Sequence, residues 1–252
     1  MTDRLCAEGL SVAFGDRSVL HELNLSLPDG KVTAIIGPNG CGKSTLLRTM
    51  ARLISPAKGR ILLDGAPSTA QPTRAVAQQL AILPQVAQAP PGIRVEEHVK
   101  RGRTPHQSPM RPRTIAARTA VHSAIDGQGI TDLADRRVEN LSGGQRQRVW
   151  IAMTLAQETG IVLLDEPTTY LDLPLQIEVL KLIRRLSDER GLTTAMVLHD
   201  INLAARFADH VVAIRAGRLI CVGPPAEMIT SERMLQIFDL DCVVIPEPFL
   251  AT

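Results

Sequence analysis

The feature that most restricts the fold of this chain is a glycine-rich segment placed between two apolar runs. Residues 37–45 read GPNGCGKST and fit the pattern G-x-x-x-x-G-K-[ST]. A strand-like run over residues 32–36 precedes this segment, and residues 43–54 carry apolar side chains at helical spacing. In such a unit, backbone N–H groups and a helix N-terminus surround an anion. The segment therefore predicts a nucleoside triphosphate site, against the alternative of a glycine-rich turn that binds nothing.

Individual residues of this phosphate loop (residues 37–45) have distinct predicted roles. Lys43 is expected to reach the β- and γ-phosphates, and the Ser44 hydroxyl is expected to bind Mg²⁺. Cys41 stands beside Lys43, so we expect positive surroundings to lower the pKa of its thiol and make it reactive; a small residue without a role is the alternative. The predicted phosphate-binding residues are Gly37, Pro38, Asn39, Gly40, Cys41, Gly42, Lys43, Ser44 and Thr45.

The apolar runs along the chain predict an α/β fold. Residues 32–36, 161–164 and 194–198 lack polar alternation, as expected of parallel strands buried on both faces. Helical patterns separate them, one of which is formed by Ile177, Leu180, Ile183 and Leu186. Alternating strands and helices favour a mostly parallel sheet covered on both sides.

Two regions depart from this pattern. Residues 5–27 and 60–64 alternate like antiparallel strands, as do residues 211–214 and 219–222 across a turn. Residues 86–140 contain no convincing strand and are rich in Arg and Ala, which predicts a helical insertion. We therefore expect a single domain over residues 1–252, with residues 86–140 inserted as a helical subdomain.

The composition narrows the class of protein. The chain has 252 residues, of which 44% are apolar, and its formal net charge is +2, which is too balanced for a polyanion-binding protein as a whole. Four Phe, one Tyr and one Trp leave few aromatic rings to stack on nucleic-acid bases. Four cysteines without a C-x-x-C pair, and the lack of a signal-like or membrane-spanning run, lead us to expect a cytosolic protein.

Basic residues are concentrated in one segment of the predicted helical insertion. Residues 94–118 contain seven Arg and Lys residues against two Glu residues, a local charge of +5. A solvated helix face and a docking surface are both open interpretations of this segment.

Polar side chains follow three of the apolar runs. Asp165 and Glu166 end the run over residues 161–164, and His199 ends the next one. Parallel strands place their carboxyl ends at one sheet edge, so we expect Asp165 to hold Mg²⁺, Glu166 to polarise a water, and His199 to lie near the γ-phosphate. Gln85, after Pro84, is expected to be a further Mg²⁺ ligand.

A second glycine-rich helix start lies at residues 141–145, which read LSGGQ. Ser142 and Gln145 have the spacing of a capping box. Gly143 and Gly144 in the first turn disfavour the helix, which is understandable if the backbone approaches a ligand closely. The pattern predicts a second anion-binding helix N-terminus in a chain with one phosphate loop.

Together these motifs resemble the ATP-binding subunit of ABC transporters. LSGGQ about 20 residues before IVLLDE, a glutamine loop and a following histidine occur in the order typical of that family. The resemblance implies a P-loop NTPase (RecA-like) core with an antiparallel β-subdomain and a helical subdomain. It also implies that LSGGQ of one subunit closes on ATP held by the phosphate loop of another, in a head-to-tail homodimer.

Site roles follow from the resemblance residue by residue. Phe14 matches the aromatic residue that stacks on adenine, and Asp172 matches the aspartate of the D-loop. Glu166 matches the catalytic base and His199 the switch histidine, while Ser142, Gly143, Gly144 and Gln145 match the ATP-contacting signature. The implied Mg²⁺ ligands are Ser44, Gln85 and Asp165.

The D-loop reads TTYLD, where many family members have SALD, and this variant narrows the subfamily. DEPTTYLDL, SGGQRQRVWIAMTLAQET, RGRTPHQ and VLHDINLAARFADHVVAIRAGRL are similar to ATPases of ferric-siderophore importers. This resemblance implies two integral-membrane permease subunits, an indirectly linked substrate-binding protein, no nucleic acid, and a peripheral position on the cytoplasmic face of the membrane. Importers of cobalamin or haem, a soluble ABC ATPase acting on nucleic acid or cofactor assembly, and a regulatory nucleotide sensor remain alternatives.

Overall fold

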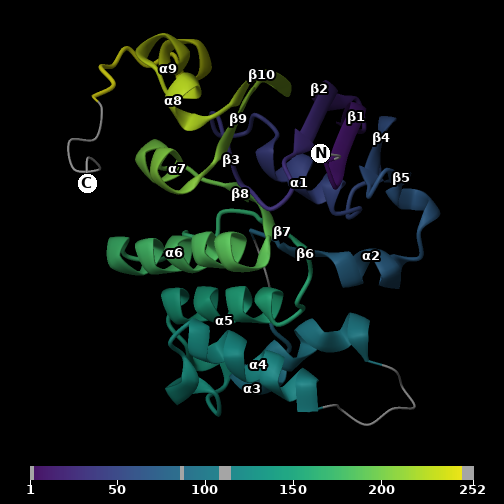
Figure 1. Ribbon diagram of the computed structural model, residues 1–252, viewed down its shortest axis with the longest axis vertical. Coiled ribbons are helices and arrows are strands. Elements are labelled where there is room, and N and C mark those ends of the chain that lie inside the picture. The colour runs from purple at the N-terminus through teal and green to yellow at the C-terminus, as the bar shows by residue number, and fades with distance from the viewer. Residues whose placement is uncertain (1–2, 86–87, 108–114, 246–252) are drawn as a thin grey trace.

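A six-stranded, mostly parallel sheet forms the centre of the fold (Figure 1). The computed structural model describes residues 3–85, 88–107 and 115–245. The strand order is β10-β9-β3-β8-β7-β6, and every neighbouring pair is parallel except the β9–β10 hairpin. Side chains of β3, β7 and β8 are buried throughout, which confirms the predicted strands covered on both faces. The six strands are β3 (Val32–Ile36), β6 (Leu80–Leu83), β7 (Ile161–Leu164), β8 (Thr193–Val197), β9 (His210–Arg215) and β10 (Arg218–Gly223).

Residues near the N-terminus form a smaller antiparallel sheet, which the alternating sequence pattern predicts. Its order is β2-β1-β4-β5. Buried residues of β1 and β2, such as Leu10 and Leu27, share one core cluster with Leu46 and Leu47 of α1. Burial of one face of this sheet therefore fixes α1, and with it the phosphate loop, against the large sheet. The elements concerned are β1 (Leu5–Phe14), β2 (Arg17–Leu27), β4 (Lys58–Leu63), β5 (Ala66–Pro67) and α1 (Lys43–Met50).

The opposite face of the large sheet is covered by helices from the C-terminal half of the chain. A second core cluster joins strand residues such as Val162 and Met196 to Leu180 and Ile183, which lie on the stripe predicted for the helix over residues 177–186. The helices near this face are α5 (Gly143–Leu155), α6 (Leu173–Arg190), α7 (Ile201–Phe207), α8 (Pro225–Met228) and α9 (Ser231–Phe238). The core is thus built from aliphatic side chains on both sides of one sheet.

The described residues between 88 and 140 form helices and one isolated bridge, between Arg94 and Arg137. A third core cluster packs Val95, Val99 and Val121 against Val149 of α5. Because α5 contributes side chains to this cluster and to the sheet's cluster, it connects the helical region to the core. The elements are α3 (Val95–Lys100), α4 (Ile115–Gly127), and the 3₁₀ helices η2 (Arg101–His106), η3 (Thr131–Leu133) and η4 (Val138–Asn140). Residues 86–87 and 108–114 of the predicted insertion lie outside the described part, and its boundaries stay a prediction.

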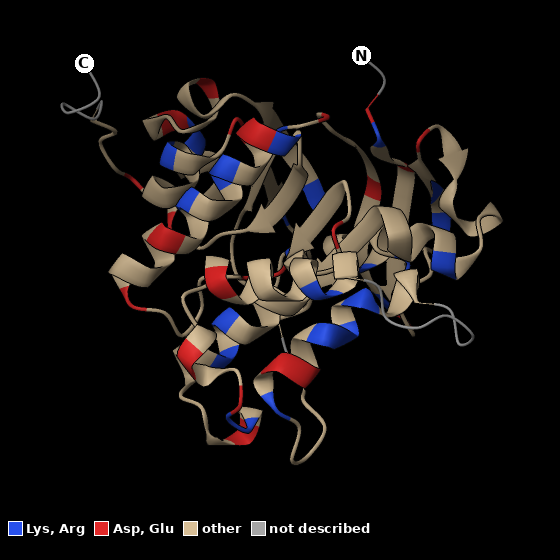
Figure 2. Cartoon of the chain, turned by 60° about the horizontal axis from the view of Figure 1, so that its bottom comes forward, with Lys and Arg blue, Asp and Glu red and all other residues tan. Residues whose placement is uncertain are grey.

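The basic segment of residues 94–118 is only partly a solvated face. Lys100 pairs with Glu96 at 2.7 Å, and the buried Arg103 donates to Glu158 at 2.7 Å. Figure 2 shows Lys and Arg alternating with Asp and Glu over the helices, without a field of one sign. Arg111 and Arg113 of this segment lie outside the described residues, and its role in docking stays a proposal.

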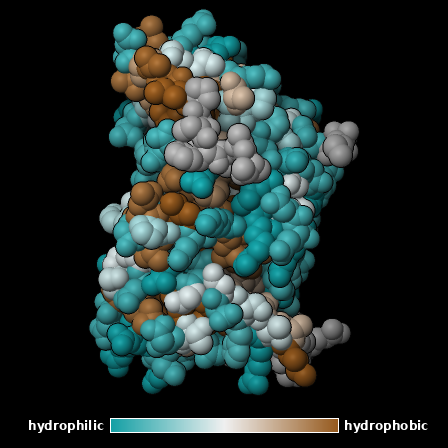
Figure 3. Space-filling view, turned by 60° about the vertical axis from the view of Figure 1, so that its left-hand side comes forward, coloured by the Kyte–Doolittle hydropathy of each residue, from teal (hydrophilic) through white to brown (hydrophobic). Residues whose placement is uncertain are grey.

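Two further elements and one surface complete the description. Helices η1 (Ser68–Ala70) and α2 (Thr73–Gln79) connect the two sheets. Figure 3 shows apolar side chains near the end of the molecule where Figure 1 places α9; Leu235 of α9 and Val243, which follows this helix in the chain, are both exposed. Among the described residues, no helix combines the length and apolar character needed to cross a membrane.

Candidate functional site

The register of the parallel strands brings the predicted site residues to one edge of the sheet. Leu164 of β7 pairs with Leu83 of β6 on one side and with Met196 of β8 on the other. The residues that follow these strand ends are Gln85, Asp165, Glu166 and His199. The phosphate loop follows β3, the neighbour of β8, so the sheet places all of these groups around one cleft.

The conformation of the phosphate loop depends on its glycines. Gly37, Gly40 and Gly42 have φ values of 147°, 74° and 108°. A Cβ on Gly37 would collide with the carbonyl oxygen of Ile214, and one on Gly42 would lie 2.6 Å from the Leu20 side chain. The backbone conformation therefore favours glycine at all three positions, and Gly37 and Gly42 also lack the space for a side chain.

Lys43 is folded back over the phosphate loop. Its ammonium group donates to the carbonyl oxygens of Gly37 at 2.7 Å and Pro38 at 2.9 Å, and the residue is buried. An ammonium group has three N–H donors. These contacts hold the charge at the loop and leave one donor for a phosphate oxygen.

Ser44 and Asp165 form the part of the site that fits a divalent cation. Ser44 Oγ donates to Asp165 Oδ1 at 2.8 Å. Burial raises the pKa of Asp165, although the hydrogen bond from Ser44 and the positive charge of Arg48, whose Nε lies 3.9 Å from Oδ2, act against it. Asp165 Oδ2 is buried without a hydrogen-bond partner among the described residues. A buried, unsatisfied carboxylate oxygen beside a serine hydroxyl is the oxygen-rich donor set that Mg²⁺ prefers.

Glu166 is held by three side chains from different elements. Oε1 lies 2.8 Å from His199 Nε2 and accepts from Gln85 Nε2 at 2.8 Å, and Oε2 accepts from Thr169 at 3.2 Å. Burial alone would raise the pKa of Glu166, but the contacts with His199, Gln85 and Thr169 outweigh it and hold the pKa below its ordinary value. Its φ of 55° turns the side chain away from the path of β7. The carboxylate is thus ionised and fixed at the edge of the cleft.

These residues surround a cleft of about 540 Å³. Its lining includes Asn39, Thr45, Gln85, Glu166 and His199, and also Arg17 and Val19 of β2. Sequence reasoning missed Arg17, Val19 and Thr169. Arg17 could have been found from the antiparallel hairpin, because it pairs with Phe14. Phe14 is 52% exposed at the end of β1, where it pairs with Arg17 of the cleft lining.

The second glycine-rich helix start begins α5, and its capping box is confirmed. Ser142 Oγ accepts from the N–H of Gln145 at 3.3 Å, and Gln145 Oε1 accepts from the N–H of Ser142 at 3.0 Å. A Cβ on Gly143 would lie 3.5 Å from the Tyr170 side chain, and one on Gly144 would lie 3.2 Å from the Tyr170 carbonyl oxygen. Within one chain, the two glycines thus lie close to the segment after Glu166, while the predicted close approach to a ligand stays a prediction.

The signature residues do not line the cleft of their own chain. Ser142, Gly144 and Gln145 are absent from the described lining of the 540 Å³ cleft. Gln147 links the two regions by donating to the carbonyl oxygen of Pro167 at 3.0 Å. Asp172 accepts from the N–H of Leu175 at 3.2 Å and begins α6 as its N-cap, a structural role beside its predicted one.

The expectation of a reactive Cys41 is wrong. The residue is 5% exposed. Burial raises the pKa of its thiol, and the neighbouring Lys43 charge lowers it by less. Sequence reasoning took account of the charge but not of the depth of the side chain.

Comparisons with known proteins agree with this geometry. Residues 20–169 match the family model described as ABC transporter. The achromobactin transport ATP-binding protein CbrD of Dickeya dadantii is 49% identical over 96% of this chain and 90% of its own length. The ferric enterobactin transport ATP-binding protein FepC of Escherichia coli is 48% identical over 99% of this chain and 92% of its own length.

A solved structure extends the likeness to three dimensions. The dimeric ATP-binding cassette MJ0796, in a post-hydrolysis state with ADP and phosphate, matches with a TM-score of 0.79 and 25% identity. The match covers 88% of this chain and 98% of that one. With its phosphate loop, its buried Asp165 and its ionised Glu166 around one cleft, the chain belongs to the ABC transporter family and is an ATP-hydrolysing subunit.

Proposed function

We propose that this chain is the motor of an ABC importer for ferric siderophores. The observation that carries the ATPase part is the Glu166 carboxylate, which is fixed by His199 and Gln85 in the cleft that contains the phosphate loop. The cargo is supported by relatives named for ferric enterobactin and achromobactin transport, at 48% and 49% identity over nearly the whole chain.

The hydrogen bonds to Glu166 support its role as the base for hydrolysis. A carboxylate offers about four lone-pair sites, and the contacts with His199, Gln85 and Thr169 use three of them. The remaining site accepts a proton from water as the water oxygen bonds to the γ-phosphorus and the bond to the bridging oxygen of ADP breaks. His199 and Gln85 keep the base oriented, and Lys43 stabilises the phosphate charge.

The donor set also supports a magnesium site. Ser44 Oγ, the unsatisfied Oδ2 of Asp165 and the amide oxygen of Gln85 are the groups that would hold the ion. When bound, Mg²⁺ neutralises charge on the β- and γ-phosphates. The same side chains keep the phosphate loop and β7 together through the Ser44–Asp165 hydrogen bond.

We further propose that two copies close head to tail, so that Ser142–Gln145 of one copy contact the nucleotide of the other. Support comes from the position of these residues outside the cleft of their own chain and from the dimeric relative with ADP and phosphate. Phe14 would stack on the adenine ring, and Asp172 would lie at the dimer interface. ATP binding closes this dimer and hydrolysis reopens it, as expected where one conformation has the higher affinity for ATP.

The remaining partners follow from the importer assignment. Two integral-membrane permease subunits would bind the closing dimer at the cytoplasmic face of the membrane, with residues 94–118 on or beside the docking face. A substrate-binding protein would deliver the cargo without touching this subunit. Importers of cobalamin or haem are the alternative for cargo.

The test is uptake of radiolabelled iron as a ferric siderophore, with labelled cobalamin and haem in parallel. Cells would carry the wild-type chain, Lys43→Ala, or Lys181→Ala, which removes an exposed lysine of α6 as a matched control. We expect only Lys43→Ala to abolish uptake, and only that of the siderophore. Loss of another cargo alone would replace the siderophore assignment. Unchanged uptake of all three, with steeply salt-dependent RNA or DNA binding, would favour a soluble ATPase instead.

A further inference from the structure

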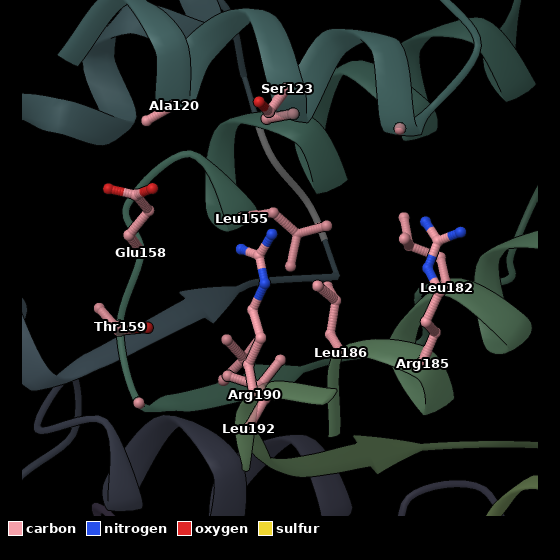
Figure 4. A pocket seen from close by; sticks show the side chains of 14 residues that line it. Ala120, Ser123, Leu155, Glu158, Thr159, Leu182, Arg185, Leu186, Arg190 and Leu192 are labelled. Atoms are coloured by element: carbon pink, nitrogen blue, oxygen red, sulfur yellow. The ribbon is translucent and has the colours of Figure 1, made fainter. Parts of the chain in front are cut away.

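A pocket beside the segment that connects α5 to β7 is separate from the nucleotide cleft. It lies between α4, α6 and the connecting residues 156–160, and its volume is about 260 Å³ (Figure 4). None of the residues that line it lines the cleft around the phosphate loop. The two sites therefore share no side chain among the described residues.

The inner surface of this pocket is aliphatic. The side chains that form it come from α5, β7, α6 and the residue before β8. A Cβ on Gly127 of α4 would lie 3.9 Å from Leu182. Because Gly127 has no side chain, α4 leaves space above Leu182 that a larger residue would fill. The aliphatic residues are Leu155, Val162, Leu182, Leu186 and Leu192.

Two cations of α6 border this aliphatic surface. Arg185 and Arg190 are exposed, and Figure 4 shows the Arg190 guanidinium next to Leu155 and the Arg185 guanidinium next to Leu182. Within the described residues neither has an ion-pair partner at 4.0 Å or less. The neighbouring Arg184 differs, because it is bound by both Asp188 and Asp209.

Glu158, the acidic residue of the described lining, and the hydroxyl of Thr159 already have hydrogen-bond partners. Glu158 accepts from Arg103 at 2.7 Å, and the Thr159 hydroxyl donates to the carbonyl oxygen of Ile161 at 2.8 Å. The charge left available to a ligand is therefore that of the two arginines. An aliphatic cavity beside guanidinium groups without partners matches a molecule that has an apolar chain and a negatively charged end.

We propose that this pocket binds a medium-chain aliphatic carboxylate, with its chain among the leucines and its carboxylate on Arg190. The volume lies below the roughly 300–1,000 Å³ typical of pockets for drug-sized ligands, which limits the occupant to a small molecule. Arg185, at the Leu182 side, adds positive potential. An occupant would touch α4, α6 and the connection between α5 and β7 at the same time.

The experiment is calorimetric titration of the full chain with sodium octanoate, with acetate and 1-octanol as probes that lack the chain or the charge. Arg190→Met should weaken octanoate binding by roughly tenfold or more and leave 1-octanol binding unchanged, since Met keeps an apolar side chain. Arg185→Met should weaken octanoate binding by a smaller factor. Lys181→Met, an exposed cation of the same helix outside the lining, is the matched control and should bind like wild type.

A second pair of variants tests the cavity while both arginines remain. Ser123→Phe places a ring at an exposed lining position and should abolish octanoate binding, whereas His122→Phe changes the exposed neighbour outside the lining and should not. The proposal is overturned if octanoate shows no saturable binding below its micellar concentration. It is equally overturned if Arg190→Met and Lys181→Met bind octanoate alike, or if acetate binds as tightly as octanoate.

Discussion

The cleft and the N-terminus of α5 are both glycine-rich helix starts suited to anions, but they differ in what surrounds them. At the cleft, Lys43 is held by carbonyl oxygens of its own loop, while Ser44 and Glu166 contact residues that follow other strands of the same chain. At α5, the side chains of Ser142 and Gln145 hydrogen-bond to each other's backbone N–H groups, and the glycines face the Tyr170 segment. The first region is organised by the fold of one chain, whereas the second is the region that we propose a second copy completes.

The largest effect on ATP turnover is expected from replacing Glu166, the proposed catalytic base in the cleft. Glu166→Gln should lower ATP turnover by about 10²–10⁴-fold, the usual contribution of a general base, and leave ATP binding intact. An ATP-bound dimer should then accumulate, measurable by light scattering beside a phosphate-release assay. A monomeric variant that hydrolyses ATP at the wild-type rate would refute the assignment of Glu166.

A change at the N-terminus of α5 should separate ATP turnover by the dimer from nucleotide binding by the single chain. Gly144→Ala places a Cβ 3.2 Å from the Tyr170 carbonyl oxygen, whereas Gly143→Ala makes an ordinary 3.5 Å contact and serves as the matched control. We expect Gly144→Ala to lower turnover roughly tenfold, less than the hundredfold that a 1 Å misplacement can cause, because the loop moves by only tenths of an ångström. Nucleotide affinity of the single chain should not change in either variant. Weaker ATP binding by monomeric Gly144→Ala would show that the two regions are not separate.

A smaller effect, on the free energy of unfolding, is expected from relieving the backbone conformation of Tyr170 between the two regions. Tyr170 has a φ of 66°, a conformation that costs a residue with a side chain about 1–2 kcal/mol relative to glycine. Tyr170→Gly should therefore recover up to about 1 kcal/mol of folding free energy, because added freedom of the unfolded chain offsets part of the gain. Urea unfolding measures it, with Tyr170→Ala as the control that removes the ring and keeps the strain. Equal stability of the two variants would mean that the turn is not strained.

The finest test concerns the protonation of Glu166. The pKa of Glu166 in the folded protein lies below its ordinary value. The stability that its contacts supply is therefore fully present above the ordinary pKa. This stability, together with the ionised form of the carboxylate, is lost as the pH falls through the lowered pKa. His199→Ala removes the strongest of the contacts that lower this pKa and should raise it, while His199→Gln retains a donor and should raise it less. NMR titration of the Glu166 carboxyl carbon measures this without relying on activity. If the pKa of Glu166 were the same in both variants as in the wild type, His199 would not be the cause of its lowered value.

Sequence patterns predict those structural features that depend on residues close together in the chain. Strand ends with polar residues were enough to predict that Asp165 and His199 lie at one edge, because parallel pairing leaves few alternatives. Arg17 and Thr169 could not be predicted in this way. Arg17 reaches the cleft through the register of a hairpin, and Thr169 reaches the Glu166 carboxylate through a turn in which Glu166 has a positive φ. The Gly144–Tyr170 contact joins segments that are separated in sequence by a whole strand, and no local pattern encodes it.

The burial of Cys41 has a consequence for how the phosphate loop withstands oxidants. Hydrogen peroxide attacks the thiolate form of cysteine, and each step from sulfenic to sulfonic acid adds oxygen atoms to the sulfur. Because burial raises the pKa of this thiol, it stays protonated at neutral pH and reacts slowly. The depth of one small side chain thus keeps the thiol of the phosphate loop in the form that reacts less readily with peroxide.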